Sequence, residues 1–114
     1  MTLFKRGDVL LVPFPFSDQS SSKKRPAIII SSDPFNRYSD DIFVIAVTSN
    51  ITRREKLGDI SIQSWQEAGL LKPSVIKPAI STIEKKLVIK TLGSLSHNDT
   101  ISLNKTLSEI FALY

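Results

Sequence analysis

Two unbroken apolar runs constrain the fold of this chain more than any other feature. They span residues 26–31 and 42–47, and turn-forming polar residues follow or precede each of them. A continuous apolar run of this length is typical of a strand that is buried on both faces. We therefore expect these runs to form two central strands of one sheet.

Shorter segments of β-type sequence surround the two central runs. Further strands are expected at residues 8–14, 58–62, 74–77, 80–83 and 87–92. Proline cannot donate a hydrogen bond to a sheet ladder. Pro13 and Pro15 are therefore expected to end the first strand or to mark a sheet edge, and Pro78 should separate the segments on either side of it.

Capping signals predict two helices. Ser64 and Glu67 match a capping box, which predicts a short helix ending near Gly69. Ser96 is the expected N-cap of a closing helix, with Asp99 near the positive end of the helix dipole. The apolar residues of this closing helix recur at helical spacing and are Leu103, Leu107, Ile110, Phe111 and Tyr114.

This order of elements predicts a mainly β fold with some α structure. We expect one domain covering residues 1–114, built as a small, strongly curved sheet or partial barrel with a short helix and a C-terminal helix. The length of 114 residues fits a single domain.

Charge and cysteine content narrow the classes of function. The net charge is +4 with a pI of about 9.5, and a basic surplus favours a polyanionic partner. The absence of cysteine excludes a disulfide scaffold and a thiolate metal site. Residues 1–8 do not resemble a secretory signal, and no segment is long and apolar enough to span a membrane. We expect a cytoplasmic protein with no membrane partner.

Several kinds of catalytic site are disfavoured by the residues that the chain lacks. His97 is the only histidine, so one subunit cannot supply a pair of imidazoles, and we expect His97 to be an exposed residue of a helix first turn. Asp40 and Asp41 are expected to be turn residues, because neighbours on an extended chain point to opposite faces. No Gly-rich phosphate loop is present. We expect neither a metal site nor a cofactor.

A basic cluster precedes the first central strand. Pro26 favours an extended conformation at Arg25, which should hold Arg25 at the rim of the sheet while Lys23 and Lys24 belong to the preceding loop. The guanidinium fork matches phosphate oxygens and stays charged at any working pH. Taken alone, the cluster favours a solvated charge run beside a strand.

Polar side chains follow the second central strand directly. Thr48, Ser49 and Asn50 can all form hydrogen bonds at the mouth of that strand, where site residues often converge. A simple turn that caps the strand explains the same three residues.

Aromatic side chains could stack on unpaired bases. Phe14, Phe16 and Trp65 are the candidates, although aromatics in small sheets commonly fill the core. Phe16, which lies beside the polar loop, is the one best placed for stacking.

Taken in order, a set of segments resembles the MazF/PemK family of toxin endoribonucleases, particularly its PemK-like branch. The resemblance includes Arg25-Pro26 and Val47-Thr48-Ser49-Asn50, and extends over nearly the whole chain. The matching segments are residues 6–18, 24–31, 47–50, 68–75, 79–85 and 92–96.

This resemblance implies an SH3-like barrel, usually a homodimer, that cleaves single-stranded RNA at short sequences without a metal ion. It also implies a cognate antitoxin of a type II system, whose disordered and often acidic tail blocks the RNA groove. By position, Arg25 and Thr48 are the family's catalytic arginine and hydroxyl. The remaining residues expected to bind RNA are Lys23, Lys24, Phe16, Ser49 and Asn50.

One departure from the family pattern lies in residues 78–82. Many MazF members carry a Gln and an Arg where this chain has Ala79 and Ser81. PemK-like relatives often lack both residues as well. We therefore expect the departure to alter the affinity for RNA or the preference for the cleaved sequence, and we expect cleavage activity to be compatible with it.

The resemblance suggests a mechanism in which the ribose 2′-OH attacks its own phosphate. Arg25 would stabilise the charge that builds on the phosphoryl oxygens, and Thr48 would add a hydroxyl hydrogen bond. We assign Arg25 charge stabilisation first and proton donation second, and we assign no general base.

Two alternatives of other classes remain. A gyrase poison is one, because CcdB toxins resemble this fold, but those depend on a C-terminal tip that carries a Trp and this chain ends Phe111-Ala112-Leu113-Tyr114. A barrel that binds RNA or protein without cutting is the other. Retention of both Arg25 and Thr48 favours the nuclease.

Overall fold

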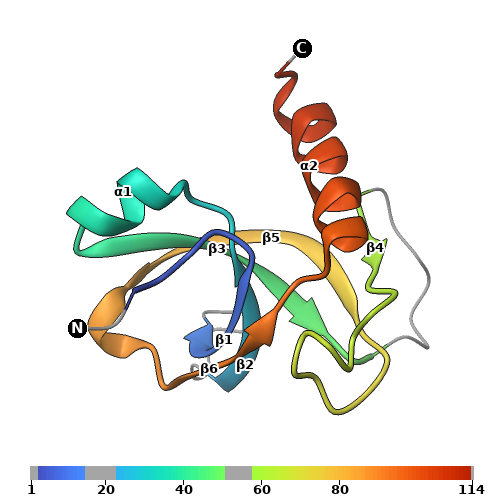
Figure 1. Ribbon diagram of the computed structural model, residues 1–114, viewed down its shortest axis with the longest axis horizontal. Helices are drawn as coiled ribbons and strands as arrows, with labels where there is room; N and C mark the ends of the chain where they lie inside the picture. Colours follow the sequence, from blue (N-terminus) through green and yellow to red (C-terminus); the bar gives the residue numbers. More distant parts are fainter. Residues whose placement is uncertain (1–2, 15–22, 51–57, 114) are drawn as a thin grey trace.

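The protein is described here by a computed structural model covering residues 3–14, 23–50 and 58–113. Within these residues six strands form one antiparallel sheet in the order β4-β5-β3-β2-β1-β6, which curls into a half-barrel (Figure 1). The strands are β1 (Asp8–Phe14), β2 (Lys23–Ile29), β3 (Asp41–Thr48), β4 (Ile60–Ser61), β5 (Val75–Glu84) and β6 (Lys90–Ser94). The helical elements are α1 (Asp33–Tyr38), the 3-10 turn η1 (Lys85–Leu87) and α2 (His97–Phe111). The expected mainly β fold with a C-terminal helix is confirmed.

Strand β5 is continuous, although two separate strands were predicted on either side of Pro78. The partner of Ile45 on β3 is Ile80, whereas the partner of Val47 is Ile76, so the register shifts between these pairs. Pro78 lies in the shifted stretch, where β5 carries extra residues. The strand continues through Pro78 because a residue that cannot donate a ladder hydrogen bond is tolerated at a bulge.

The two faces of the sheet are covered by separate core clusters. Strand β3 shows the division, since Val44 and Ala46 belong to one cluster while Ile45 and Val47 belong to the other. Full burial of such side chains contributes about 1.5–3 kcal/mol each relative to exposure. The first core cluster contains Val9, Ile28, Ile45, Val47, Ile60, Ile62, Ala68, Leu70, Ile76, Leu95, Leu103 and Leu107. The second core cluster contains Leu10, Val12, Phe14, Ala27, Ile29, Ile42, Val44, Ala46 and Ile83.

The predicted N-cap of the closing helix α2 is confirmed. Asp99, which was expected only to interact with the helix dipole, also accepts hydrogen bonds from another segment. Ser96 Oγ accepts a hydrogen bond from the Asp99 backbone N–H at 3.2 Å. The buried Asp99 carboxylate in turn accepts backbone N–H bonds from Gln63 and Ser64, both at 2.9 Å. Asp99 therefore joins the start of α2 to residues 63–69.

The short helix predicted from Ser64 to Gly69 is wrong, because these residues form consecutive turns. The carbonyls of Ser64, Trp65 and Gln66 accept backbone bonds from residues four, five and three positions ahead, respectively, so no single helical pattern is maintained. Gly69 has a φ of +83° and turns the chain out of a helical path.

Helix α2 is buried on one side as far as Leu107, and its last turn is exposed. Leu103 and Leu107 pack in the first core cluster, whereas Ile110 and Phe111 are 43% and 53% exposed. Figure 1 shows the C-terminal half of α2 projecting away from the sheet, so the apolar stripe predicted as one face is divided. Tyr114, its last predicted member, lies outside the described residues. Among the described residues, no helix is long and apolar enough to cross a bilayer.

Helix α1 was not predicted, although its sequence contains a start signal. Ser32 Oγ accepts a hydrogen bond from the Phe35 backbone N–H, and Pro34 occupies the first turn. Asp33 places a carboxylate near the N-terminus of the helix, where negative charge is favoured. The sequence Ser-Asp-Pro is thus an ordinary helix start that the helix's short length obscured.

Candidate active site

Arg25 and Thr48 belong to neighbouring strands and line the same cavity. Strands β2 and β3 are antiparallel, and their last pair at this end is Ala27 with Ala46. Arg25 and Thr48 each lie two residues beyond that pair on their own strand. Because both border one cavity, both side chains can act on one bound group.

Arg25 is held in the sheet rather than in the preceding loop. It is half-buried, its Nε atom is enclosed by the protein, and it pairs with Val12 of β1. The next residue, Pro26, pairs with Leu11 and fixes its own φ. Arg25 consequently has a backbone fixed by β1, as its position before a proline predicted.

Thr48 ends β3 and starts a turn. Its Oγ1 accepts a hydrogen bond from the Asn50 backbone N–H at 3.1 Å, so the strand-capping interpretation of this segment is correct. A hydroxyl can accept and donate at the same time, and this bond leaves the hydroxyl hydrogen of Thr48 available as a donor. The turn fixes the oxygen and still permits contact with a ligand.

Arg25 and Thr48 both line a cavity of about 590 Å³. This volume lies within the range of about 300–1,000 Å³ that is typical of ligand sites. The apolar part of the lining includes Leu11, Pro26, Val47, Leu70 and Leu92. Besides Arg25 and Thr48, the side chains that can form hydrogen bonds are Ser49, Lys72, Ser74, Lys90 and Thr91.

Two glycines allow one wall of this cavity to form. A Cβ atom on Gly69 would lie 2.0 Å from the Leu92 carbonyl oxygen, and one on Gly93 would lie 2.7 Å from the Ala68 carbonyl oxygen. Leu92 is the extra residue at the bulge where the β1–β6 register shifts. The chain around Gly69 can therefore pack closely against β6, and residues 69–72 form part of the cavity lining.

Other residues expected to bind RNA are placed less centrally. Ser49 lines the cavity, whereas Asn50, Lys23 and Lys24 are exposed and do not. Lys23 and Lys24 belong to β2 rather than to the loop that was predicted for them. Phe16 lies outside the described residues.

The other aromatic candidates belong to the core. Phe14 is 2% exposed and packs in the second core cluster, and Trp65 packs against the first core cluster. The interpretation of Phe14 as a core residue is confirmed. Trp65 is partly buried against the core.

Lys72, Lys90 and Thr91 are lining residues that the sequence did not reveal. Lys90 was expected only as part of a strand, and Lys72 only as part of a matching segment. Their position depends on the bulge of β6 and on the contact at Gly69, neither of which leaves a local sequence signal.

Residues considered for other chemistry lie apart from this cavity. His97 is the exposed first residue of α2, as predicted. In the described ranges, no three His, Cys, Asp or Glu residues are grouped in a way that could hold a metal ion. Ala79 packs against the second core cluster and Ser81 is half-buried on β5, so neither lines the cavity.

The curled antiparallel sheet with a closing helix, and a cavity lined by an arginine and a threonine, describe a small half-barrel protein with one candidate site. Residues 5–111 match the family described as PemK-like, MazF-like toxin of type II toxin-antitoxin system, and the chain belongs to this family. An endoribonuclease MazF from Staphylococcus epidermidis is 31% identical over 107 residues, which cover 92% of this chain and 88% of the relative.

Solved structures support the same fold. An endoribonuclease from mycobacterial species superimposes with a TM-score of 0.75 at 20% identity, covering 98% of this chain and 94% of the other. MazF from Deinococcus radiodurans gives a TM-score of 0.77 at 12% identity, covering 98% and 99%. An endoribonuclease in complex with its cognate antitoxin, also mycobacterial, gives 0.74 at 18% identity, covering 98% and 96%.

Proposed function

We propose that this chain is a sequence-specific endoribonuclease toxin that cleaves single-stranded RNA without a metal ion. The observation that carries the proposal is that Arg25 and Thr48 line one cavity. Its 31% identical relative is an endoribonuclease MazF, which supports the same reaction type. Cytoplasmic mRNA is the substrate that fits a toxin of this family.

The reaction is an internal transfer within the RNA chain. The 2′-oxygen forms a bond to the adjacent phosphorus as it loses its proton, and the bond between phosphorus and the 5′-oxygen of the next nucleotide breaks. Negative charge develops on the phosphoryl oxygens and on the leaving 5′-oxygen, which finally takes up a proton.

Arg25 is suited to the charge that develops in this reaction. The β1–β2 pairing fixes its backbone, and its guanidinium fork can donate to two phosphoryl oxygens. Removal of one such donor in other enzymes slows the reaction about 10²–10³-fold. Thr48 would donate its hydroxyl hydrogen to a phosphoryl oxygen or to the leaving oxygen.

A cognate antitoxin is the second proposed partner. A fold relative is an endoribonuclease in complex with its antitoxin, and the net charge of +4 suits an acidic peptide. We expect such a peptide to compete with RNA, because both would neutralise the same basic groups.

A homodimer is proposed from the apolar groups that one chain leaves exposed. Phe35 of α1 stacks on Phe43 of β3 with ring centroids 5.0 Å apart, yet both remain more than one-third exposed. Ile110 and Phe111 of α2 are also exposed, and Figure 1 shows α1 and α2 rising on the same side of the β3–β5 pair. Sedimentation should show a dimer that Phe111→Asp weakens, and a monomer at all accessible concentrations would contradict it.

The proposed function is tested by incubating the purified protein with a long mRNA in excess EDTA, alongside a DNA gyrase supercoiling assay. We expect cuts at a recurring short sequence and no effect on supercoiling. Cleavage that disappears with chelator would contradict the metal-independent reaction. Inhibition of gyrase without RNA cleavage would replace the proposal with a gyrase poison, and RNA binding without cutting would indicate a non-catalytic barrel.

A further inference from the structure

A second cavity adjoins the one that contains Arg25. It has a volume of about 450 Å³, and its lining includes Lys85, Lys86, Lys90 and Thr91. Lys90 and Thr91 also line the first cavity. Because these two residues belong to β6, the two hollows meet across the edge strand of the described sheet.

The hollow shared by η1 and β6 is strongly basic. Three lysines line it, and the Glu84 carboxylate lies 3.3 Å from Lys86 Nζ. The side chains of this pair are 79% and 55% exposed, and exposed pairs of this kind contribute about 0–1 kcal/mol. Lys86 can therefore exchange Glu84 for an anionic ligand at little cost.

Apolar groups lie between the lysines. Phe4, Val88 and Ile89 complete the lining of the second cavity. Single-stranded nucleic acids bind to surfaces of this type, where cations contact the phosphates and apolar or aromatic groups contact the bases. An isolated inorganic anion would make no use of the apolar groups.

We propose that Lys85, Lys86 and Lys90 form a track that binds the phosphates of the RNA flanking the cleaved bond. The proposal rests on RNA cleavage at Arg25 and adds a substrate-binding region on the far side of β6. Lys90 joins the two regions, because it borders both the cleavage cavity and the track.

Lysines also occur on edge strands for another reason, since they discourage pairing with a second chain. That explanation fits Lys90, which belongs to β6. It does not account for Lys85 and Lys86, which lie on η1 outside the strand ladder and line the same hollow.

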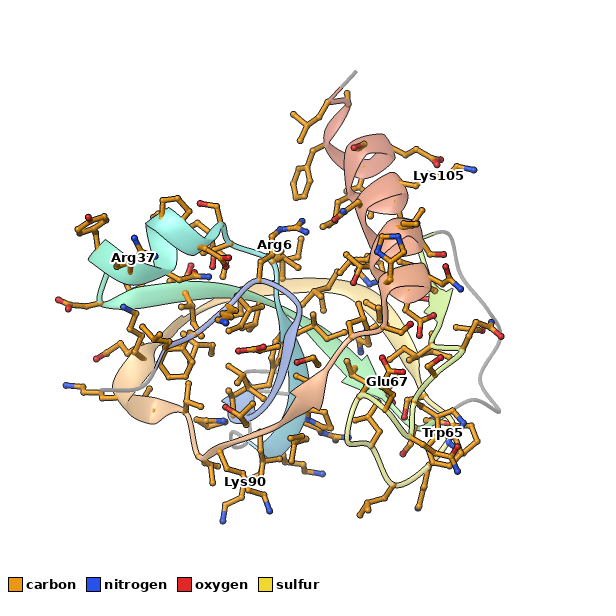
Figure 2. All side chains as sticks on the ribbon, in the orientation of Figure 1. Arg6, Arg37, Trp65, Glu67, Lys90 and Lys105 are labelled. Carbon is orange, nitrogen blue, oxygen red and sulfur yellow. The ribbon has the colours of Figure 1, made fainter. Side chains whose placement is uncertain are left out.

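The track is tested with the double variant Lys85→Ala/Lys86→Ala and the matched control Lys105→Glu. Both variants lower the net charge by two. Figure 2 shows Lys105 on α2, well separated from Lys90 at the lower edge, and Lys105 is exposed. Unchanged circular dichroism and melting temperature would establish that each variant is folded.

Binding is measured first, with a long single-stranded RNA that carries a 2′-deoxyribose at the cleaved position and so cannot react. For every phosphate that a variant no longer binds, the slope of log K against log salt should fall by about 0.7, so the slope for the double variant should fall by about 1.4. The control should keep the wild-type slope. Equal slopes for the double variant and the control would overturn the track.

Cleavage is measured second, as the ratio of kcat/KM for a long RNA to that for a short RNA confined to the cut site. The wild type and the control should prefer the long RNA, and the double variant should lose that preference. If the double variant changed only antitoxin affinity, the track would be a protein-binding surface and the proposal would be wrong. Absence of RNA cleavage by the wild type would contradict the proposed function instead, while the binding measurement would still decide on the track.

Discussion

Arg25 of β2 and Thr48 of β3 border one cavity, and each lies two residues beyond the pair that Ala27 forms with Ala46. The register of the buried residues fixes the face of the sheet on which each side chain lies, because a shift of one residue would move that side chain to the other face. Core packing therefore places both residues at the same cavity.

Replacing Thr48 tests the role of its hydroxyl. Thr48→Ala should slow cleavage about 10²-fold, because a donor to the developing charge is lost. The same change removes the acceptor for the Asn50 N–H, so part of the loss would arise from a looser turn. Thr48→Ser keeps the hydroxyl and should recover most of the rate in single-turnover assays. Similar rates for Thr48→Ala and the wild type would contradict a catalytic hydroxyl.

The contact at Gly69 should be essential for stability and for the cavity wall. Gly69→Ala adds a methyl group against the Leu92 carbonyl at a φ of +83°, which should cost about 2–5 kcal/mol through backbone strain and overpacking together. Gly7 has a φ of +93° with no atom within 4 Å of an added Cβ, so Gly7→Ala should cost only the strain of about 1–2 kcal/mol. Urea denaturation of both variants measures the difference, and equal losses would show that the contact is unimportant.

Asp99 should stabilise the junction between α2 and residues 63–69. Asp99→Ala leaves the Gln63 and Ser64 N–H groups without their acceptors, and hydrogen bonds to a charged group are worth about 1.5–3 kcal/mol. Asp99→Asn keeps one side-chain oxygen and should lose less. The exposed neighbour Asn98 provides the control, since Asn98→Ala should change stability by no more than about 0.5 kcal/mol. Thermal unfolding with equal losses for Asp99→Ala and Asn98→Ala would refute the role of Asp99.

The sequence predicted those parts of the fold that depend on local patterns. The bounds of β1 agree with the strand predicted at residues 8–14, and the Ser96 cap of α2 was identified because its hydroxyl has a local partner. Ser64 and Glu67 show the limit of such patterns. Their capping box does not form a helix, because a distant carboxylate on Asp99 binds the N–H of Ser64 and Gly69 turns the chain.

For the candidate site as well, local sequence patterns predicted some of the residues and missed others. Arg25 and Thr48 adjoin central strands, so their placement at strand ends could be predicted from apolar runs. Lys72 and Lys90 reach the same cavity only through the bulge of β6 and the close approach at Gly69. Tertiary contacts of this kind join segments that are distant in sequence. Lys90 lies in no matching segment, and the match at residues 68–75 did not indicate a binding role for Lys72.

Single-turnover cleavage of one RNA in excess EDTA, by the wild type, Arg25→Ala and Arg25→Lys, tests the central claim most directly. We predict a loss of at least about 10²–10³-fold for Arg25→Ala, because the donors to the phosphate are removed. Arg25→Lys should recover only part of the rate, since lysine keeps the charge and lacks the planar fork. Cleavage by folded Arg25→Ala at the wild-type rate would contradict the claim that Arg25 stabilises the reacting phosphate.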